Sequence, residues 1–360
     1  MKKKDILVIG CGQAGGNLVD ELLSLDSRYN GLFINTSVRD VKGLKNAKLD
    51  RNVYLIPNTD GSGRNRAVGI SYVKDNALAI IDTIASYVQQ NEVILVSSCG
   101  GGSGSSIVPA ILRLAKKRLP NKRLHVVAIK PSLEEQTDVL ENSIGYWNDV
   151  MGAIDAFETF SIVDNDKRKD RMDINKEWAH LMDSSLNIAN GDIQGSIDDA
   201  DLKVMSTAKG YKVIYNLDLS HKIDEKMAVG KAINESIFFD APSSKCSYLG
   251  ISLKRGDYNG EKIRDQFEVS RSSYIGINES ENIVMATGCE IPRMAIDLII
   301  EELEERKKNN SAEVIFDKNE LKVEVERSVN KKEVVEVVEQ KFTSNEEVID
   351  EDDDFWGDAF

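Results

Sequence analysis

Apolar runs and helical periodicities alternate along the first half of the chain. β-rich apolar runs predict strands at 5–9, 31–35, 92–98, 124–131 and 156–164, and apolar positions three and four residues apart predict helices at 17–25, 70–90 and 107–119. Strands that alternate with helices predict an α/β fold with a doubly wound, mainly parallel sheet. Ligands of such sheets bind at the carboxyl ends of the strands.

The pattern changes after residue 170. A periodic but polar segment at 173–190 predicts a long connecting helix, and strand candidates at 210–217, 245–255, 272–280 and 281–291 interleave with helices near 222–238 and 260–270. These elements predict a second, smaller α/β domain. Residues 292–309 begin with proline and end in basic residues, as helices commonly do. The predicted units are a first domain at 1–170, a central helix at 171–195, a second domain at 196–291, a C-terminal helical extension at 292–342 and an acidic tail at 343–360.

Composition narrows the possible partners. The chain has 360 residues, 41% of them hydrophobic, and a formal net charge of −14. Because nucleic acids and many membrane surfaces are also anionic, we expect no direct nucleic-acid contact. No apolar run approaches the roughly 18 residues of a membrane span, so no membrane insertion is expected. Four cysteines without a pairing pattern indicate reduced thiols in a cytoplasmic protein.

The end of the chain combines acids with aromatic residues. Segment 344–360 holds eight acidic residues and no Lys or Arg, together with Phe355, Trp356 and Phe360. An acidic run alone is typical of a solvated, disordered tail. Aromatic side chains at such an end suit a groove on another protein, so we predict a docking tail.

Two glycine-rich segments each follow a predicted strand and precede a predicted helix: GCGQAGGN at 10–17 and CGGGSGSS at 99–106. Backbone amides without side chains, next to helix N-termini, suit a polyphosphate. Neither segment carries the lysine of a Walker loop, so Mg²⁺ would supply much of the counter-charge. A third loop at 59–66, with Arg64 and Arg66, is consistent either with closure on a terminal phosphate or with a plain surface turn.

The first glycine segment also contains G-x-G-x-x-G, which is typical of dinucleotide-binding enzymes. An NAD-dependent oxidoreductase would need an acid after the second strand to bind the ribose. Asn35 and Thr36 stand there instead, and the second glycine segment would have no role. This alternative is therefore disfavoured.

Segment 100–106 (GGGSGSS) resembles the signature loop of the tubulin/FtsZ superfamily of GTPases. The resemblance continues in order through ILVIGCGQAGGN, LFINTS, VVAIKPSLEEQ, IVDNDK, SIDDADLKVMSTAKGY and IVMATGC, and covers roughly residues 5–290. It implies a tubulin/FtsZ-like fold, with a GTP-binding first domain, a long central helix and a second, activation domain. It also implies GTP and GDP as ligands, with Mg²⁺ held mainly by phosphates and water.

The resemblance assigns residues to each part of the nucleotide. Asn165 and Asn175 would approach the base, and Glu135 would face the ribose. An asparagine amide suits the guanine edge, although Asn175 would equally suit the start of a helix. The residues assigned to the rest of the nucleotide site are Gly10, Cys11, Gly12, Gln13, Gly15, Gly16, Asn17, Asn35, Thr36, Gly100, Gly101, Gly102, Ser103, Gly104 and Ser105.

In the superfamily, the acids of one subunit complete the GTP site of the next. The resemblance assigns this catalytic role to Asp198 and Asp201, which would orient water at the terminal phosphate. Read without the resemblance, the same acids, with Asp199 beside them, would only cap a helix that begins near 199. Head-to-tail contact of this kind generates filaments, so the chain is expected to be its own partner and to hydrolyse GTP on polymerisation.

Three departures from the superfamily pattern stand out: Ser196 in place of Asn, Asp164 in place of Pro, and Thr137 after the ribose loop where Arg is familiar. The helix after Pro292 and the divergent tail most resemble the TubZ group of plasmid and phage partition filaments. That likeness implies DNA segregation through a DNA-binding adaptor, which the tail would bind. An FtsZ-type division-ring GTPase and a non-hydrolysing interaction protein remain as alternatives.

Overall fold

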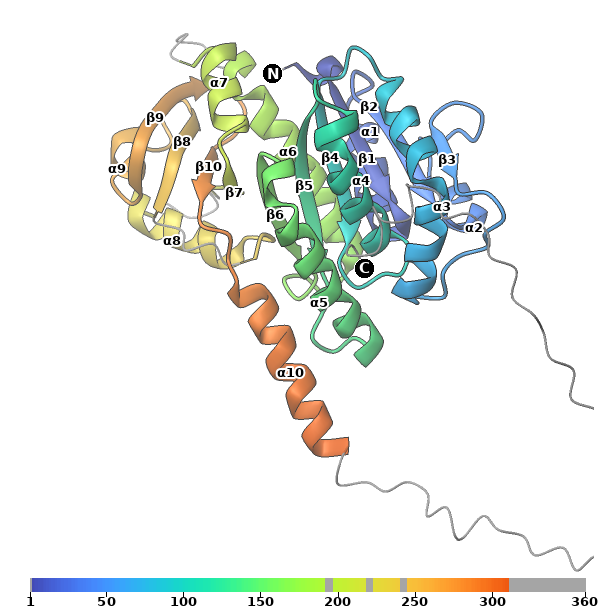
Figure 1. Cartoon of the computed structure of the whole chain (residues 1–360). Helices are drawn as coiled ribbons and strands as arrows, with labels where there is room; N and C mark the ends of the chain where they lie inside the picture. The colour runs from blue at the N-terminus through green and yellow to red at the C-terminus, as the bar shows by residue number, and fades with distance from the viewer. Residues whose placement is uncertain (1, 192–196, 218–222, 240–244, 311–360) are drawn as a thin grey trace, which may run out of the picture. The chain divides into compact units, whose positions relative to one another are not determined.

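The computed structural model describes residues 2–191, 197–217, 223–239 and 245–310, which belong to one compact unit (Figure 1). Its strands are β1 (Ile6–Cys11), β2 (Asn30–Asn35), β3 (Val53–Leu55), β4 (Glu92–Ser98), β5 (Arg123–Lys130), β6 (Thr159–Asp164), β7 (Gly210–Asn216), β8 (Lys245–Lys254), β9 (Glu268–Asn278) and β10 (Ile283–Cys289). Its helices are α1 (Gly12–Leu25), α2 (Val38–Lys42), α3 (Arg66–Ala85), α4 (Gly104–Arg118), α5 (Thr137–Gly152), α6 (Arg171–Gly191), α7 (Asp199–Ser206), α8 (Glu225–Glu235), α9 (Gly260–Arg264) and α10 (Met294–Asn310), with short 3₁₀ turns at Lys3–Asp5 and Ile154–Ala156.

The described strands form one ten-stranded sheet in the order β3-β2-β1-β4-β5-β6-β7-β10-β8-β9. Neighbours from β3 to β7 are parallel, β10 runs antiparallel to β7 and β8, and β8 and β9 are again parallel. The predicted doubly wound, mainly parallel α/β fold is therefore confirmed. The chain leaves β1 in one direction across the sheet and β4 in the other, so a crevice opens between the ends of these two strands.

Helices cover both faces of the parallel region. On one face α3, α4 and α5 pack side by side, and α10 lies along α5; on the other face α1 pairs with the central helix α6 (Figure 1). The α5–α10 contact is an apolar cluster of Leu140, Ile296, Ile299 and Leu303. Strands β1 and β6 are buried along their whole length, as expected for parallel strands covered on both faces.

Several boundaries differ from the sequence prediction. Helix α1 begins at Gly12 rather than at residue 17, so most of the first glycine segment is the first turn of a helix. Helix α5 was not predicted, although its buried positions, which include Leu140, Tyr146 and Val150, recur at helical spacing. The two predicted domains also share hydrogen bonds, since β7 pairs with β6 at Gly210 and Tyr211. The predicted unit boundaries stay a prediction, and Ser196 and the tail lie outside the described residues.

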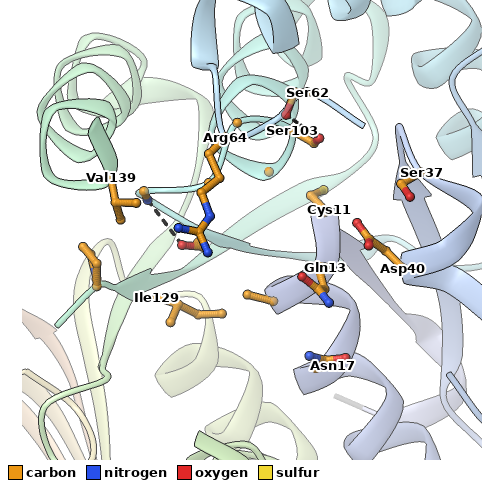
Figure 2. A pocket seen from close by; sticks show the side chains of 18 of the residues that line it. Cys11, Gln13, Asn17, Ser37, Asp40, Ser62, Arg64, Ser103, Ile129 and Val139 are labelled. Atoms are coloured by element: carbon orange, nitrogen blue, oxygen red, sulfur yellow. Dashed lines mark hydrogen bonds between the residues drawn. The ribbon is translucent and has the colours of Figure 1, made fainter. Parts of the chain in front are cut away.

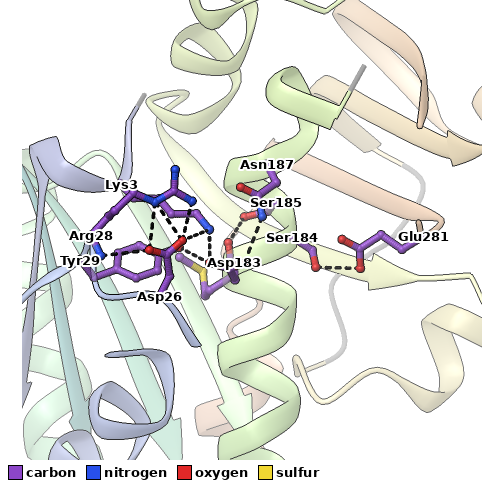
Figure 3. Close-up of polar contacts among 10 residues, drawn as sticks. Lys3, Asp26, Arg28, Tyr29, Asp183, Ser184, Ser185, Asn187 and Glu281 are labelled. Carbon is purple, nitrogen blue, oxygen red and sulfur yellow. Dashed lines mark hydrogen bonds and ion pairs between the residues drawn. The ribbon is translucent and has the colours of Figure 1, made fainter. Parts of the chain in front are cut away.

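Polar contacts fix α6 on two sides (Figure 3). The buried Lys3 ammonium pairs with Asp26 at 2.9 Å and with Asp183 of α6 at 2.5 Å, and the Tyr29 hydroxyl donates to Asp183 at 2.8 Å. At the next residue of α6, the hydroxyl of Ser184 donates to Glu281 of the β9–β10 connection at 2.8 Å. The central helix is thus tied both to the N-terminal 3₁₀ turn with the α1–β2 connection and to the second half of the sheet.

Candidate functional site

A cavity of about 520 Å³ opens at the carboxyl ends of β1, β4, β5 and β6. Each strand contributes a residue at or just beyond its end: Cys11, Ser98, Pro131 and Asn165. The cavity therefore lies at the reversal of strand order, where a doubly wound sheet binds its ligand.

Helices α1 and α4, which follow the two glycine segments, begin at the cavity with uncapped N-termini. The N-cap residues are Cys11 for α1 and Ser103 for α4, and neither side chain bonds to the first turn. The N-cap side chains of α2 (Ser37) and α5 (Gln136) also make no such bond, whereas α3, α7, α8 and α9 are capped by the side chains of Asn65, Asp198, Asp224 and Asn259. Since the first amides of a helix need acceptors, the α1 and α4 termini can donate to an anion in the cavity.

Glycines let these two helix starts meet. Gly12 has a left-handed φ of +70°, and a Cβ there would lie 2.9 Å from the Gly104 amide nitrogen. A Cβ on Gly104 would lie 2.7 Å from the carbonyl oxygen of Cys11. Any side chain at either position would push the two termini apart, which explains the bare backbone at both strand ends.

Twelve of the residues assigned to the nucleotide from the sequence line this cavity: Cys11, Gly12, Gln13, Asn17, Gly100, Gly101, Gly102, Ser103, Gly104, Glu135, Asn165 and Asn175. Six assigned residues lie behind the wall instead: Gly10, Gly15, Gly16, Asn35, Thr36 and Ser105. Their roles at the nucleotide stay predictions.

The residues behind the wall shape it. A Cβ on Gly10 would lie 2.8 Å from Gly16 Cα, and one on Gly15 would strike the carbonyl group of Val96, so these glycines let α1 pack close to the sheet. Thr36 shares a 2.6 Å hydrogen bond with the hydroxyl of Ser103, a lining residue. Thr36 therefore supports the lining residue Ser103 and does not itself line the cavity. Two further bonds are internal: Asn35 Oδ1 accepts from the Ser37 amide at 3.1 Å, and Ser105 donates to Gly101.

The far end of the cavity carries amide and ionic groups. Asn175 is 6% exposed, and its amide makes only a weak 3.8 Å contact, with the sulfur of Met172, among the described residues. A buried amide that lines a cavity and lacks a strong partner is available to a ligand. Glu135 forms an ion pair with Arg171, which the sequence did not single out.

The loop that carries Glu135 is held from α10. The Arg306 guanidinium donates to the carbonyl oxygens of Leu133 at 2.6 Å and Glu135 at 2.7 Å, and to Glu302 at 2.7 Å. Bonds from a charged donor are among the stronger ones in proteins. The C-terminal helix therefore takes part in positioning one side of the cavity.

Asp164, one of the departures from the superfamily pattern, has a buried partner. The Lys130 ammonium bonds to Asp164 at 3.0 Å and to Asp166 at 2.8 Å, and all three residues flank the loops that carry Glu135 and Asn165. Burial would raise the pKa of Asp166, but its bonds with Lys130 and Ser132 outweigh burial and hold the pKa below its usual value. This network joins the two loops at the far end of the cavity.

The two predicted catalytic acids do not line the cavity. Asp198 is the N-cap of α7: its carboxylate accepts from the amides of Ala200 and Asp201, each at 2.8 Å, and Asp201 accepts from the Asp198 amide at 3.1 Å. The capping alternative is therefore realised. Asp198 is nevertheless exposed.

The sequence left other lining residues unassigned, among them Ser37, Asp40 and Ser62. Ser37 and Asp40 face Cys11 and Gln13 across the cavity (Figure 2). Burial raises the pKa of Asp40. One carboxylate and several hydroxyl groups beside an anion site suit Mg²⁺, which keeps waters and needs few protein ligands.

Of the arginines in the third loop, only Arg64 lines the cavity. Arg66 turns away and pairs with Asp149, which also pairs with Arg113 at 2.7 Å. Within the described ranges there is no group of three or more His, Cys, Asp or Glu side chains placed to hold a metal ion. No helix among those residues combines the length and apolar character needed to cross a bilayer.

Residues 5–172 match the GTPase domain of the tubulin/FtsZ family, and residues 201–290 match the C-terminal domain of the tubulin-like protein TubZ. The chain is 34% identical to the tubulin-like protein TubZ of Clostridium botulinum C phage, over 96% of this chain and 98% of that protein. A solved structure of Clostridium botulinum phage c-st TubZ, truncated at its C-terminal tail, superposes with a TM-score of 0.79 at 34% identity, covering 85% of this chain and 99% of that one.

More distant relatives share the fold. CetZ from Methanosaeta thermophila has a TM-score of 0.67 at 22% identity, over 86% of this chain and 94% of that one. These matches leave the dinucleotide-dependent alternative without support, in line with a buried Asn35 that bonds within its own loop. The chain belongs to the tubulin/FtsZ family and, within it, is a homologue of TubZ.

Proposed function

We propose that the chain binds GTP in the cavity at the ends of β1 and β4, hydrolyses it, and assembles head to tail into filaments. The observation that carries this proposal is the convergence of two uncapped helix N-termini on one cavity. A row of free amides and two positive helix ends favour a polyphosphate. The match to a GTPase-domain family supports guanine as the base.

The other end of the cavity suits the nucleoside. The amides of Asn165 and Asn175 would take the guanine edge, because each offers a donor and an acceptor. Glu135 would accept from the ribose hydroxyls while its ion pair with Arg171 fixes its position. Asp40, with Ser37 beside it, would hold Mg²⁺ through water against the phosphates; bound there, the ion would offset phosphate charge.

The hydrolytic acids would come from the next subunit. Asp198 and Asp201 are absent from the lining of their own cavity, and Asp198 is exposed at the start of α7. In a head-to-tail filament they would orient the attacking water at a neighbour's terminal phosphate. Hydrolysis would then require assembly.

We further propose that such filaments segregate plasmid or phage DNA, through a DNA-binding adaptor that binds the acidic, aromatic tail. The similarity to a phage TubZ supports this role over that of an FtsZ-type division ring. A solved structure that is 15% identical to this chain is a helical model of a two-stranded filament of TubZ-Bt. At that identity the two chains are shown to share only the fold, so a filament of this chain is part of the proposal. Four cysteines without a disulfide agree with a cytoplasmic setting.

The test is GTP turnover and light scattering measured across protein concentrations on the full chain. Turnover and scattering should share one threshold concentration. Asp201→Asn keeps the size of the side chain at the α7 N-terminus, and should assemble but hydrolyse far more slowly. Asp199→Asn removes the same charge from the neighbouring position and should retain turnover. Turnover proportional to concentration from the lowest value would refute the shared site.

A further inference from the structure

Positive charge is scarce around the cavity. Among the described residues that line it, only Arg64 and Arg171 are cationic, and Asp40 and Glu135 are anionic. Arg171 is committed to Glu135. The amides at the α1 and α4 termini can bind phosphate oxygens, but they carry only partial charge. Among the side chains that line the cavity, a nucleoside triphosphate therefore meets one cationic group that no carboxylate of the described residues neutralises, the guanidinium of Arg64.

The backbone of Arg64 is fixed beside the second glycine segment. Its carbonyl oxygen accepts from the Asn142 side-chain amide at 2.7 Å, and the same amide donates to the Gly100 carbonyl at 3.1 Å. Next to it, the Ser62 hydroxyl shares a 3.1 Å bond with Ser103. A Cβ on Gly102 would lie 3.0 Å from the Arg64 carbonyl carbon, so the glycine is what lets the two loops touch. Arg64 is thus anchored at the phosphate end.

The side chain of Arg64 is free to change partner. It reaches from this loop into the cavity (Figure 2) and donates from Nη1 to Gln136 Oε1 at 2.8 Å. Both side chains are exposed, and the acceptor is neutral. A phosphate group is the better partner for a guanidinium, because it is charged and two of its oxygens accept two parallel bonds. The arrangement in the structure is one that a phosphate would displace.

We propose that Arg64 leaves Gln136 to bind the terminal phosphate of a nucleoside triphosphate, and that it thereby discriminates triphosphate from diphosphate. This inference rests on the proposed guanine-nucleotide function. Arg64 takes the place that a loop lysine holds in Walker-type sites. Arg66, two positions later, cannot do so, because its guanidinium is engaged with Asp149.

The test compares the binding of GDP and of guanosine 5′-(β,γ-imido)triphosphate, by calorimetry with Mg²⁺, on the full chain below the concentration at which scattering begins. Arg64→Ala should weaken triphosphate binding ~10-fold or more and diphosphate binding less than ~3-fold, because one charged contact is lost only with the triphosphate. Arg64→Lys should fall between, since it keeps the charge without the fork. Arg39→Ala, an exposed arginine of α2 that does not line the cavity, is the matched control and should change neither.

A second variant separates the exchange of partners from a structural role. Gln136→Ala frees the guanidinium and should leave triphosphate binding unchanged or tighter. Equal losses for both nucleotides in Arg64→Ala, no loss in either, or a triphosphate-selective loss in Gln136→Ala would overturn the inference. If the unaltered chain binds both nucleotides and only the Arg64 result fails, the proposed function stands; if it binds neither, both proposals fall.

Discussion

Replacing Lys130 by methionine tests how the far side of the cavity is held together. Lys130 is 3% exposed and Asp164 is 5% exposed. The Lys130 ammonium forms ion pairs with Asp164 at 3.0 Å and with Asp166 at 2.8 Å. Lys130→Met leaves the buried Asp164 carboxylate without its cation. Removing one partner of a buried ion pair costs about 3–5 kcal/mol of unfolding free energy.

The double variant Lys130→Met/Asp164→Asn supplies the decisive comparison. Asparagine at 164 still accepts the Asp166 amide, which bonds to Asp164 at 3.1 Å, but it carries no charge. With both buried charges gone, most of the destabilisation should disappear, because a buried pair contributes little net stability. The double variant should therefore be more stable than Lys130→Met alone.

Urea unfolding of the full chain at neutral pH gives the free energies, and guanine-nucleotide affinity gives the effect on the site. The coupling energy in this cycle should exceed about 1 kcal/mol, and Lys130→Met should weaken nucleotide binding since the Glu135 and Asn165 loops lose their shared anchor. If the two single effects simply add, or if Lys130→Met unfolds at the same urea concentration as the parent, the network does not hold the loops as argued.

Substitutions of Arg306, Lys212 and Glu92 test three further features of the structure. Arg306→Ala should speed nucleotide dissociation ~5-fold or more, because two charged bonds to the ribose-side loop are lost; stopped-flow release should show this, and Lys307→Ala, an exposed neighbour, should not. Lys212 is buried, forms no ion pair with any described residue, and burial lowers its pKa to about 8 from 10.5. Lys212→Met should therefore stabilise the chain by about 2–3 kcal/mol in urea unfolding. Burial would raise the pKa of Glu92, but its hydrogen bonds with His125 and then Arg123 outweigh burial and lower the pKa from 4.5 to about 2. The stabilisation of the folded chain by ionised Glu92 is thus complete above about pH 4.5 and is lost as the pH falls toward 2. In Glu92→Gln the free energy of unfolding should therefore fall less steeply between pH 4.5 and pH 2.

The sequence predicted the phosphate end of the site well because its signals are local. Gly12 and Gly104 follow apolar strands directly and allow an approach that no other residue would, and both segments line the cavity. Gly15 carried the same local signal with a different cause, since it packs α1 against Val96. A glycine pattern alone does not separate contact with a ligand from contact between helix and sheet.

Contacts between distant segments could not be predicted in this way. Arg306 reaches the Glu135 loop from 171 positions along the chain, and no periodicity marks it. In the sequence, Asp164 was noted only as a departure from the family pattern. Its ion pair with Lys130 could not be predicted, because the two residues come together only through the pairing of β5 with β6. The acids at the N-terminus of α7, Asp198 and Asp201, had two interpretations in the sequence, as a helix cap or as catalytic groups. The structure shows the cap and leaves the catalytic role a prediction.

The short segment 131–136 is where these separate contacts meet. Arg306 holds its carbonyl oxygens from α10, Asp166 accepts from the Leu133 amide at 3.4 Å, and Gln136 accepts from Arg64. If a terminal phosphate takes Arg64, as proposed, the segment loses its bond to the phosphate end and keeps the other two. Loss of the phosphate restores that bond. The bound nucleotide would then change the contacts of the same six residues that Arg306 of α10 holds. A substitution at Gln136 should therefore alter the effect of Arg306→Ala on the rate of nucleotide release, and a substitution at Lys307 should not.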